Sequence, residues 1–401
     1  MKLLKNLSLL AAIIYFALSV IQVLFVMDAP RGDELYFVPD LQYTLENGLW
    51  DAIRRNVSIP FTIVHYFPFK FFGLPGVKVV NLLLSLLFIF YAFKKTGVID
   101  HLKYLLFYMA TVLYFFTGSN DAIFSLSLGI FFIETICIFT NKKGNLALAI
   151  SALIVAAFTR ELIIVFLPFI ALSLFLVRKT LFDQWRKMAV PALLFCVLLA
   201  LNIPSIQENS TLSYDRKKPP ATTSSNWVQR QHLSQLLYDS GELKPGTHVS
   251  WDEVDIYLAD NGQDALPSTS FEGMFFDIEL TIKEFFIDLQ SATFRTVRQI
   301  GVVYLLFAAI LFIAFRQRKP DIIVLFKLGL LAAGLCLFSF FIISTVELRW
   351  MAPILLLNVV VLRKDFKLNP KLISLNNALM LLLTIYGCYK IILRMEVTSL
   401  V

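Results

Sequence analysis

Residues 7–27 read LSLLAAIIYFALSVIQVLFVM, and residues 31–37, just beyond them, read RGDELYF. An apolar run of about 20 residues is long enough to cross a bilayer as a helix. The run lacks a small-x-small cleavage motif, so we expect an uncleaved first helix rather than a signal peptide. This helix would deliver two adjacent carboxyl groups, those of Asp33 and Glu34, to the membrane surface.

The composition of the whole chain also indicates a membrane protein. Of its 401 residues, 58% are hydrophobic and only 16% are charged, and the mean hydropathy is +0.72. These values are too apolar for a soluble protein of this length. The net charge of +7 does not indicate nucleic-acid binding, because the basic residues are scattered between apolar runs and form no single patch.

Apolar runs of spanning length recur along the sequence, and they predict an all-α polytopic membrane protein with about 11 transmembrane helices. The predicted spans are residues 7–27, 79–93, 102–117, 121–140, 145–158, 161–177, 188–203, 299–315, 322–344, 350–362 and 373–393. The four cysteines all fall inside these spans, where we expect them to pack as small apolar side chains; they are Cys137, Cys196, Cys336 and Cys388.

The basic residues predict which loops face the cytoplasm. With the N-terminus inside, every second loop is basic, as the positive-inside rule requires. The inside residues are Lys94, Lys95, Lys103, Lys142, Lys143, Arg178, Lys179, Arg186, Lys187, Arg316, Arg318, Lys319, Arg363, Lys364, Lys367 and Lys371.

This layout divides the chain into three parts. Residues 1–203 form a transmembrane module of seven spans, which includes an outer loop at 28–78. Residues 204–298 form an extracytoplasmic cap that is too small for a catalytic domain with a core of its own. Residues 299–401 form a C-terminal module of four spans.

The outer loop 28–78 contains two predicted helices. An amphipathic helix is expected from Pro39 to about Asn47, with Gly48 as its stop signal. The apolar run 60–72 is too short to span and carries His65 and Lys70, so we expect a helix that lies in the membrane interface.

Ionisable residues from four separate places in the sequence are predicted to meet at the outer face. Carboxylates there would activate a hydroxyl group, and arginines would hold a phosphate through paired charge-assisted hydrogen bonds. The simpler interpretation is that the acids cap helices and that neighbouring charges pair with each other. The residues are Asp33, Glu34, Asp121, Arg160, Glu161, Glu347 and Arg349.

Other chemistry finds little support in the sequence. No phosphate-binding glycine loop, nucleophile elbow or metal-ligand spacing is present, so we expect neither a cofactor nor a metal. Glu134 and Lys327 lie within predicted spans, and we expect both side chains to reach toward the cytoplasmic interface.

An ordered series of short motifs remains. Residues 33–36 read DELY, 48–50 read GLW, 59–60 read IP and 70–73 read KFFG. Later in the chain, Asp121 opens a span, residues 158–161 read FTRE before Leu167-Pro168, and residues 347–353 read ELRWMAP.

In order and spacing, this series resembles the GT-C membrane glycosyltransferases, in particular the group that contains protein O-mannosyltransferases and lipid A aminoarabinose transferases. The chain departs from that pattern at two places. It has Ile59 where the family commonly has proline, and it has Arg160-Glu161 where the family commonly has Lys-Gly. These departures bear on the substrates more than on the chemistry.

The resemblance implies a GT-C fold and an inverting glycosyltransferase that moves a sugar from a polyprenyl-phosphate donor to a lipid-linked glycan, lipid or protein acceptor. It implies Asp33 as the base, Glu34 and Asp121 as residues that orient the acceptor or support Asp33, and Arg160 and Arg349 as phosphate ligands. The predicted supporting residues are Tyr36, His65, Lys70, Glu161 and Glu347. The expected location is the bacterial inner membrane with the site facing outward, or the endoplasmic reticulum lumen in a eukaryote.

Two other functions stay open. A transporter or flippase of lipid-linked sugars would share the many spans, but it should show internal repeats and charges at mid-membrane. An O-antigen polymerase or ligase also handles polyprenyl-linked glycans, but it normally relies on arginines in a large outer loop and lacks an early Asp-Glu pair.

Overall fold

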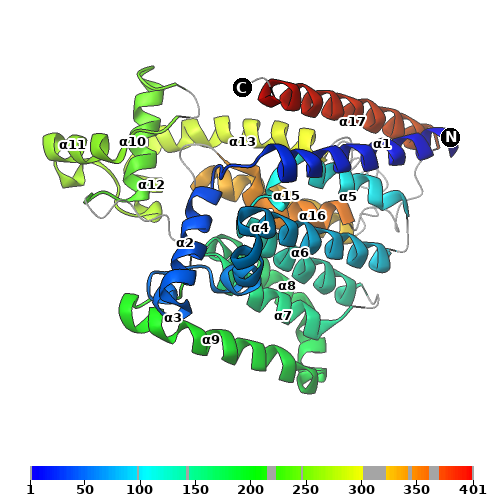
Figure 1. The fold of residues 1–401 in the computed structure, drawn as a ribbon, viewed down its shortest axis with the longest axis horizontal. Helices are drawn as coiled ribbons and strands as arrows, with labels where there is room; N and C mark the ends of the chain where they lie inside the picture. The colour runs from blue at the N-terminus through cyan, green and yellow to red at the C-terminus, as the bar shows by residue number, and fades with distance from the viewer. Residues whose placement is uncertain are drawn as a thin grey trace. The chain divides into compact units, whose positions relative to one another are not determined.

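The computed structural model describes residues 2–96, 99–140, 144–214, 223–244, 247–300, 322–341, 346–360 and 370–399. All regular structure within these ranges is helical (Figure 1). Six helices in this part of the chain are long and apolar enough to cross a membrane, and three shorter helices are also apolar. These helices indicate an integral membrane protein.

The predicted spans and the observed helices agree in position more than in length. Ten of the eleven predicted spans overlap a helix, whereas 299–315 lies outside the described residues except for its first two. The predicted span 102–117 forms a helix of only 13 residues, and the helix within 350–362 has nine. By length and composition, the described residues contain six helices that suit a span, and the number of eleven stays a prediction.

The chain forms two compact units. The first unit contains residues 1–215, 296–330 and 352–401, and the second contains residues 216–295 and 331–351. The helices of the first unit are α1 (Lys2–Ile21, with a π-helical end at Gln22–Val26), α2 (Glu34–Asn47), α3 (Leu49–Arg54), α4 (Ile59–Thr96), α5 (Ile99–Thr111), α6 (Asp121–Phe139), α7 (Leu146–Thr159), α8 (Ile163–Asp183), α9 (Ala189–Asn209), α16 (Ala352–Val360) and α17 (Pro370–Ser399).

Within the first unit, α6 is the central helix. Its side chains are buried on nearly every side, as expected for a helix that is apolar all round. In Figure 1, α17 lies alongside α1, and α2 crosses the direction of α1 and α6 near one end of these helices. Helix α2 starts at Glu34 and not at Pro39 as predicted, and it stops at Gly48, which has a φ of 90° as a glycine stop allows.

Helix α4 is a hairpin of two helical arms. Gly73 breaks it with a φ of 61° and a ψ of −146°, a backbone conformation that favours glycine. His65 Nε2 lies 3.0 Å from Asn81 Oδ1, whereas 16 residues of straight helix would separate the two by about 24 Å. The predicted interfacial helix 60–72 is thus the first arm, folded back on the span that follows it.

Substitution of Gly76 should destabilise this hairpin. A Cβ atom built on Gly76 lies 2.8 Å from the carbonyl carbon of Pro68 in the opposite arm. We expect Gly76→Ala to lower the free energy of unfolding by about 1–3 kcal/mol, the usual cost of overpacking. Gly329→Ala is the control, because nothing described lies within 4 Å of the added carbon. Equal unfolding midpoints for the two variants in denaturing detergent would contradict the close packing.

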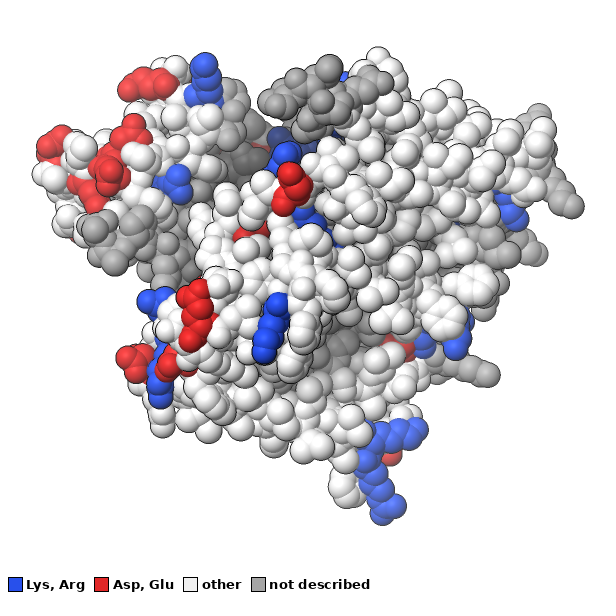
Figure 2. Space-filling model, viewed as in Figure 1, with Lys and Arg blue, Asp and Glu red and all other residues white. Residues whose placement is uncertain are grey.

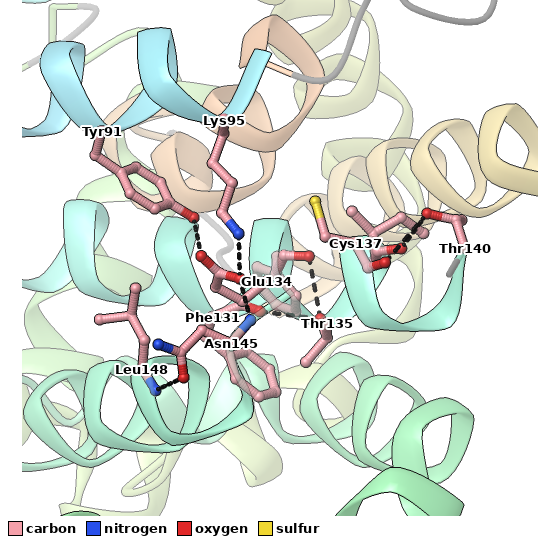
Figure 3. A network of polar contacts seen from close by, with 11 residues as sticks. Tyr91, Lys95, Phe131, Glu134, Thr135, Cys137, Thr140, Asn145 and Leu148 are labelled. Carbon is pink, nitrogen blue, oxygen red and sulfur yellow. Dashed lines mark hydrogen bonds and ion pairs between the residues drawn. The ribbon is translucent and has the colours of Figure 1, made fainter. Parts of the chain in front are cut away.

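A buried network joins α4, α6 and α7 at another place in the unit (Figure 3). Glu134 of α6 is fully buried and accepts hydrogen bonds from Tyr91 Oη at 2.8 Å and from the Asn145 backbone N–H at 2.7 Å. Lys95 Nζ forms an ion pair with it at 2.7 Å. The prediction that Glu134 reaches to the interface is therefore wrong: its carboxylate is held inside by three donors, which a charge buried in a protein requires.

The surface of the first unit is mostly uncharged over its long helices. Figure 2 shows white surface there, with Lys, Arg, Asp and Glu gathered toward the ends of these helices. Large side chains such as Phe25, Leu87 and Phe175 are more than half exposed. Because exposed apolar surface on this scale is unfavourable in water, the pattern fits a protein that bilayer hydrocarbon surrounds.

The second unit is small and helical. It contains α10 (Trp227–Asp239), α11 (Trp251–Asn261), α12 (Ser270–Phe276), most of α13 (Ile278–Ile300) and half of α15 (Ile322–Phe341). Capping boxes start α10 at Asn226 and α11 at Ser250. A core cluster around Leu233, Val254 and Leu258 holds α10 and α11 together.

Candidate functional site

The first acidic residue of α2 that points inward is Glu34, and it is the centre of a buried polar cluster. Its side chain is 1% exposed. One carboxylate oxygen accepts the Gly118 backbone N–H at 2.7 Å, and the other accepts the Arg31 backbone N–H at 3.0 Å. Glu34 thereby connects the segment after α1 to the loop before α6, 84 residues further along the chain.

Lys78 provides the positive charge for this cluster. It lies on the second arm of α4 and is 1% exposed. Its Nζ atom lies 3.7 Å from Glu34 Oε1 and also donates a hydrogen bond to the Met27 carbonyl oxygen at the end of the first apolar helix. A buried carboxylate needs such a partner, because an isolated ion inside a protein is strongly unfavourable.

The loop at residues 117–121 is fixed from several sides. Asn81 donates from its amide to the carbonyl oxygens of Thr117 and Ser119, the second at 3.1 Å. Ser119 in turn donates its hydroxyl to Asp121 Oδ2 at 3.1 Å. The loop therefore carries the contacts of Glu34 on one side and those of Asp121 on the other.

Asp121 forms an ion pair with Arg160. Asp121 is 1% exposed, and its Oδ1 atom contacts the Arg160 guanidinium. Arg160 follows the last residue of α7 in an extended conformation. Asn120 and Ser58 both donate to the carbonyl oxygen of Thr159, at 3.1 and 2.8 Å, and so fix the backbone that presents the arginine.

Asp33 occupies a different environment from its neighbour. It holds the N-cap position of α2 but makes no capping hydrogen bond from its side chain. Its side chain is half-buried, and that of Tyr36, on the first turn of the same helix, is exposed. The two adjacent acids are thus separated in role: the oxygens of Glu34 are bonded inside the protein, while Asp33 lies closer to the surface.

The remaining predicted residues have varied positions. His65 is buried between the Phe61 carbonyl oxygen and Asn81, where it holds the two arms of α4 together. Lys70 and Glu161 are exposed. Arg160 pairs with the buried Asp121 and not with Glu161, its neighbour in the sequence.

Glu347 and Arg349 belong to the second unit and form an ion pair with each other. Trp350, the next residue, stacks on Phe338 with ring centroids 6.4 Å apart. The sequence allowed two interpretations of Glu347 and Arg349: they bind substrate, or they simply pair with each other. The observed ion pair agrees with the second.

Sequence reasoning missed Lys78, Asn81 and Ser58. Lys78 stands next to the predicted span 79–93, and a lysine beside the start of an apolar run is a signal that could have been used. Asn81 and Ser58 are common polar residues, and only their long-range contacts reveal what they do.

Two buried acids in the second unit were also missed. Glu284 and Asp288 lie one turn apart on α13 and are 2% and 4% exposed. Burial raises the pKa of Glu284 to about 7, and the nearby Asp239 carboxylate acts in the same direction against Lys283 and Gln235. Burial and the Glu284 carboxyl raise the pKa of Asp288 to about 7, against the Val346 backbone N–H and Arg295.

The second unit should therefore lose stability as the pH rises. Below pH about 4 both acids are protonated in the folded and the unfolded chain. Between pH about 4 and about 7 the unfolded chain releases these protons while the folded unit keeps them, so folding becomes less favourable until both states are ionised. Hydrogen exchange of residues 278–295, corrected for intrinsic rates, should show weaker protection at pH 8 than at pH 5. A Glu284→Gln/Asp288→Asn variant should lose this difference, and equal protection in the parent chain would contradict the prediction.

Comparisons with models of protein families, with curated proteins and with solved structures find no match for this chain. Within the described ranges, no three His, Cys, Asp or Glu side chains are arranged to hold a metal ion.

Proposed function

We propose that this chain is an inverting glycosyltransferase that transfers a sugar from a polyprenyl-phosphate donor to a hydroxyl group on the non-cytoplasmic side of a membrane. One observation carries the proposal. Asp33 and Glu34 follow the first long apolar helix, and Glu34 is hydrogen-bonded to the 117–121 loop, which also contacts the Asp121–Arg160 pair. Carboxylates and cations are thus collected at the end of membrane-type helices, where a lipid-phosphate substrate has its polar group.

Asp33 is the proposed base. The acceptor hydroxyl oxygen attacks the anomeric carbon opposite the donor phosphate, its proton passes to the Asp33 carboxylate, and the bond from the anomeric carbon to the phosphate oxygen breaks. The products are the glycosylated acceptor with inverted configuration, polyprenyl phosphate and protonated Asp33. Glu34 serves as a positioning residue, because both of its oxygens accept backbone N–H groups inside the protein.

Arg160 is the proposed phosphate ligand in the first unit. A guanidinium has five N–H donors, so an arginine paired with one carboxylate still has donors for a phosphate oxygen. Negative charge on the leaving phosphate grows as the glycosidic bond breaks, and a fixed cation at that place stabilises the transition state. Arg349, predicted from the sequence for the same task, stays a prediction.

The sequence resemblance to the GT-C enzymes supports the same proposal through the order of its motifs. A transporter of lipid-linked sugars is the competing function. In the described residues, Glu34 and Asp121 lie at the starts of α2 and α6, and Lys78 lies shortly after the break in α4. Glu134 and Lys327 are also buried, in the last two turns of α6 and the first two turns of α15. A transporter calls for charges at mid-membrane instead.

A reconstitution experiment separates the two functions. The purified full-length chain is placed in phosphatidylcholine vesicles with a panel of radiolabelled undecaprenyl-phosphate sugars and a membrane extract that supplies acceptors. Label that moves into a new product, together with release of undecaprenyl phosphate, supports the transferase. Movement of intact donor between leaflets without release supports a transporter and overturns the proposal.

A further inference from the structure

Helix α13 has an unusual distribution of side chains. Ile278, Ile282 and Phe286 follow at intervals of four residues, so they form a stripe along one side of the helix, and all are more than half exposed. The acids Glu284 and Asp288, on another side, are almost fully buried. A helix surrounded by water would have the opposite arrangement.

Helix α12, directly before α13, also carries exposed apolar side chains. Phe271 and Phe275 lie one turn apart with ring centroids 5.4 Å from each other, and they are 69% and 56% exposed. Only Asp277 separates α12 from α13. We call Phe271, Phe275, Ile278, Ile282 and Phe286 the α12–α13 apolar set. Five large apolar side chains exposed within 16 consecutive residues mark an interaction surface.

Charged residues border the set on α13. Glu279 and Lys283 are exposed, and Lys283 pairs with Asp239 of α10 at 2.5 Å. Apolar residues on one side with charged residues beside them are typical of a helix that lies in the plane of a membrane interface, its apolar side in the acyl chains and its charges among the headgroups.

The sequence after α13 indicates which partner covers this surface. Residues 301–315 read GVVYLLFAAILFIAF and contain no charge, so they have the composition of a membrane segment. Helix α13 thus leads into an apolar run of the kind that enters a bilayer, which brings lipid within reach of its exposed side. The long helices of the first unit have the same membrane-type composition.

We propose that the α12–α13 apolar set inserts into the outer edge of the bilayer hydrocarbon, so that the second unit is bound to the lipid surface through its own side chains. This unit would then be a membrane-associated cap and not a freely hydrated one. The acids Glu284 and Asp288 face the protein interior because the opposite side of α13 meets lipid. The inference does not depend on the proposed glycosyl transfer.

Fluorescence quenching in vesicles tests the inference. A single cysteine replaces Ile282 or Phe286 in a full-length chain whose four native cysteines are changed to serine, and it is labelled with bimane. The control is Asp252→Cys on α11, where the native side chain is exposed and charged. In phosphatidylcholine vesicles, doxyl-labelled lipid should quench positions 282 and 286 several-fold more than position 252, and aqueous iodide should quench position 252 most.

Two results would overturn the inference. Iodide could quench position 286 as strongly as position 252, which would place the set in water. Alternatively, position 286 could be shielded from both quenchers while cysteines at 286 cross-link two chains. The apolar set would then be covered by a second copy of the protein and not by lipid. If the cysteine-free chain fails to fold, Phe286→Trp and Asp252→Trp in the native-cysteine chain ask the same question. The added emission at 286, and not at 252, should be quenched by brominated lipid.

Discussion

Replacement of Asp33 by asparagine should abolish sugar transfer while the protein stays folded in the membrane. Asparagine keeps the size of the side chain but cannot accept the acceptor's proton, and loss of a general base typically lowers a rate by roughly 10²–10⁴-fold. Stability should change little, because Asp33 is only half-buried and asparagine has nearly the same size and shape. The measurement is the initial rate of label transfer in vesicles, with the fold checked by size-exclusion chromatography in detergent.

Asp51→Asn provides the matched control. Asp51 is also a half-buried acid near the start of a short helix, and it pairs with Arg54 on the next turn. Its substitution should leave the rate within the error of the assay. A folded Asp33→Asn enzyme with near-normal activity would show that the base lies elsewhere and would remove the mechanism proposed here.

Replacement of Lys78 by methionine should strongly destabilise the first unit. Methionine preserves the length of the side chain but leaves the Glu34 carboxylate buried without its cation and removes a donor from the Met27 carbonyl oxygen. Removal of one partner from a buried ion pair costs about 3–5 kcal/mol. Equilibrium unfolding in denaturing detergent should therefore show a lower midpoint, with the loss centred on the contact between the segment after α1 and the 117–121 loop.

Two further variants make this prediction specific. Lys70→Met changes a lysine on the other arm of the same hairpin, where the side chain is exposed, and should have little effect. Glu34→Gln in the Lys78→Met background removes the unpaired charge while it keeps a carbonyl oxygen for the Gly118 N–H, so part of the lost stability should return. If Lys78→Met is no less stable than Lys70→Met, the ion pair has no structural role.

The sequence predicted much of the secondary structure because its signals are local. The order of apolar runs indicated helices at ten of eleven predicted positions, and the glycine at position 48 marked the end of α2. The prediction failed where tertiary contacts decide. Helix α2 starts five residues early because the Arg31 N–H and the Gly118 N–H bind Glu34 and hold the chain in its first turn.

The candidate site shows the same division. Its acidic residues were identified from their place after an apolar run, which is a property of neighbouring residues in the chain. The partners of these acids could not be identified in this way. Arg160 pairs with Asp121, 39 residues away, and not with the adjacent Glu161. Glu134 could be seen in the sequence but was assigned to the interface, because nothing nearby reveals that Lys95 and Tyr91 meet it inside the protein.

The sequence by itself determined that this chain is helical, that its helices suit a bilayer and that acids follow the first of them. These features depend on hydrophobicity and periodicity, which a few consecutive residues express. Only the tertiary structure decided which charges are buried and which partners neutralise them. A buried ion is tolerated only where donors from several elements meet around it, and packing brings those elements together from positions that the sequence keeps far apart.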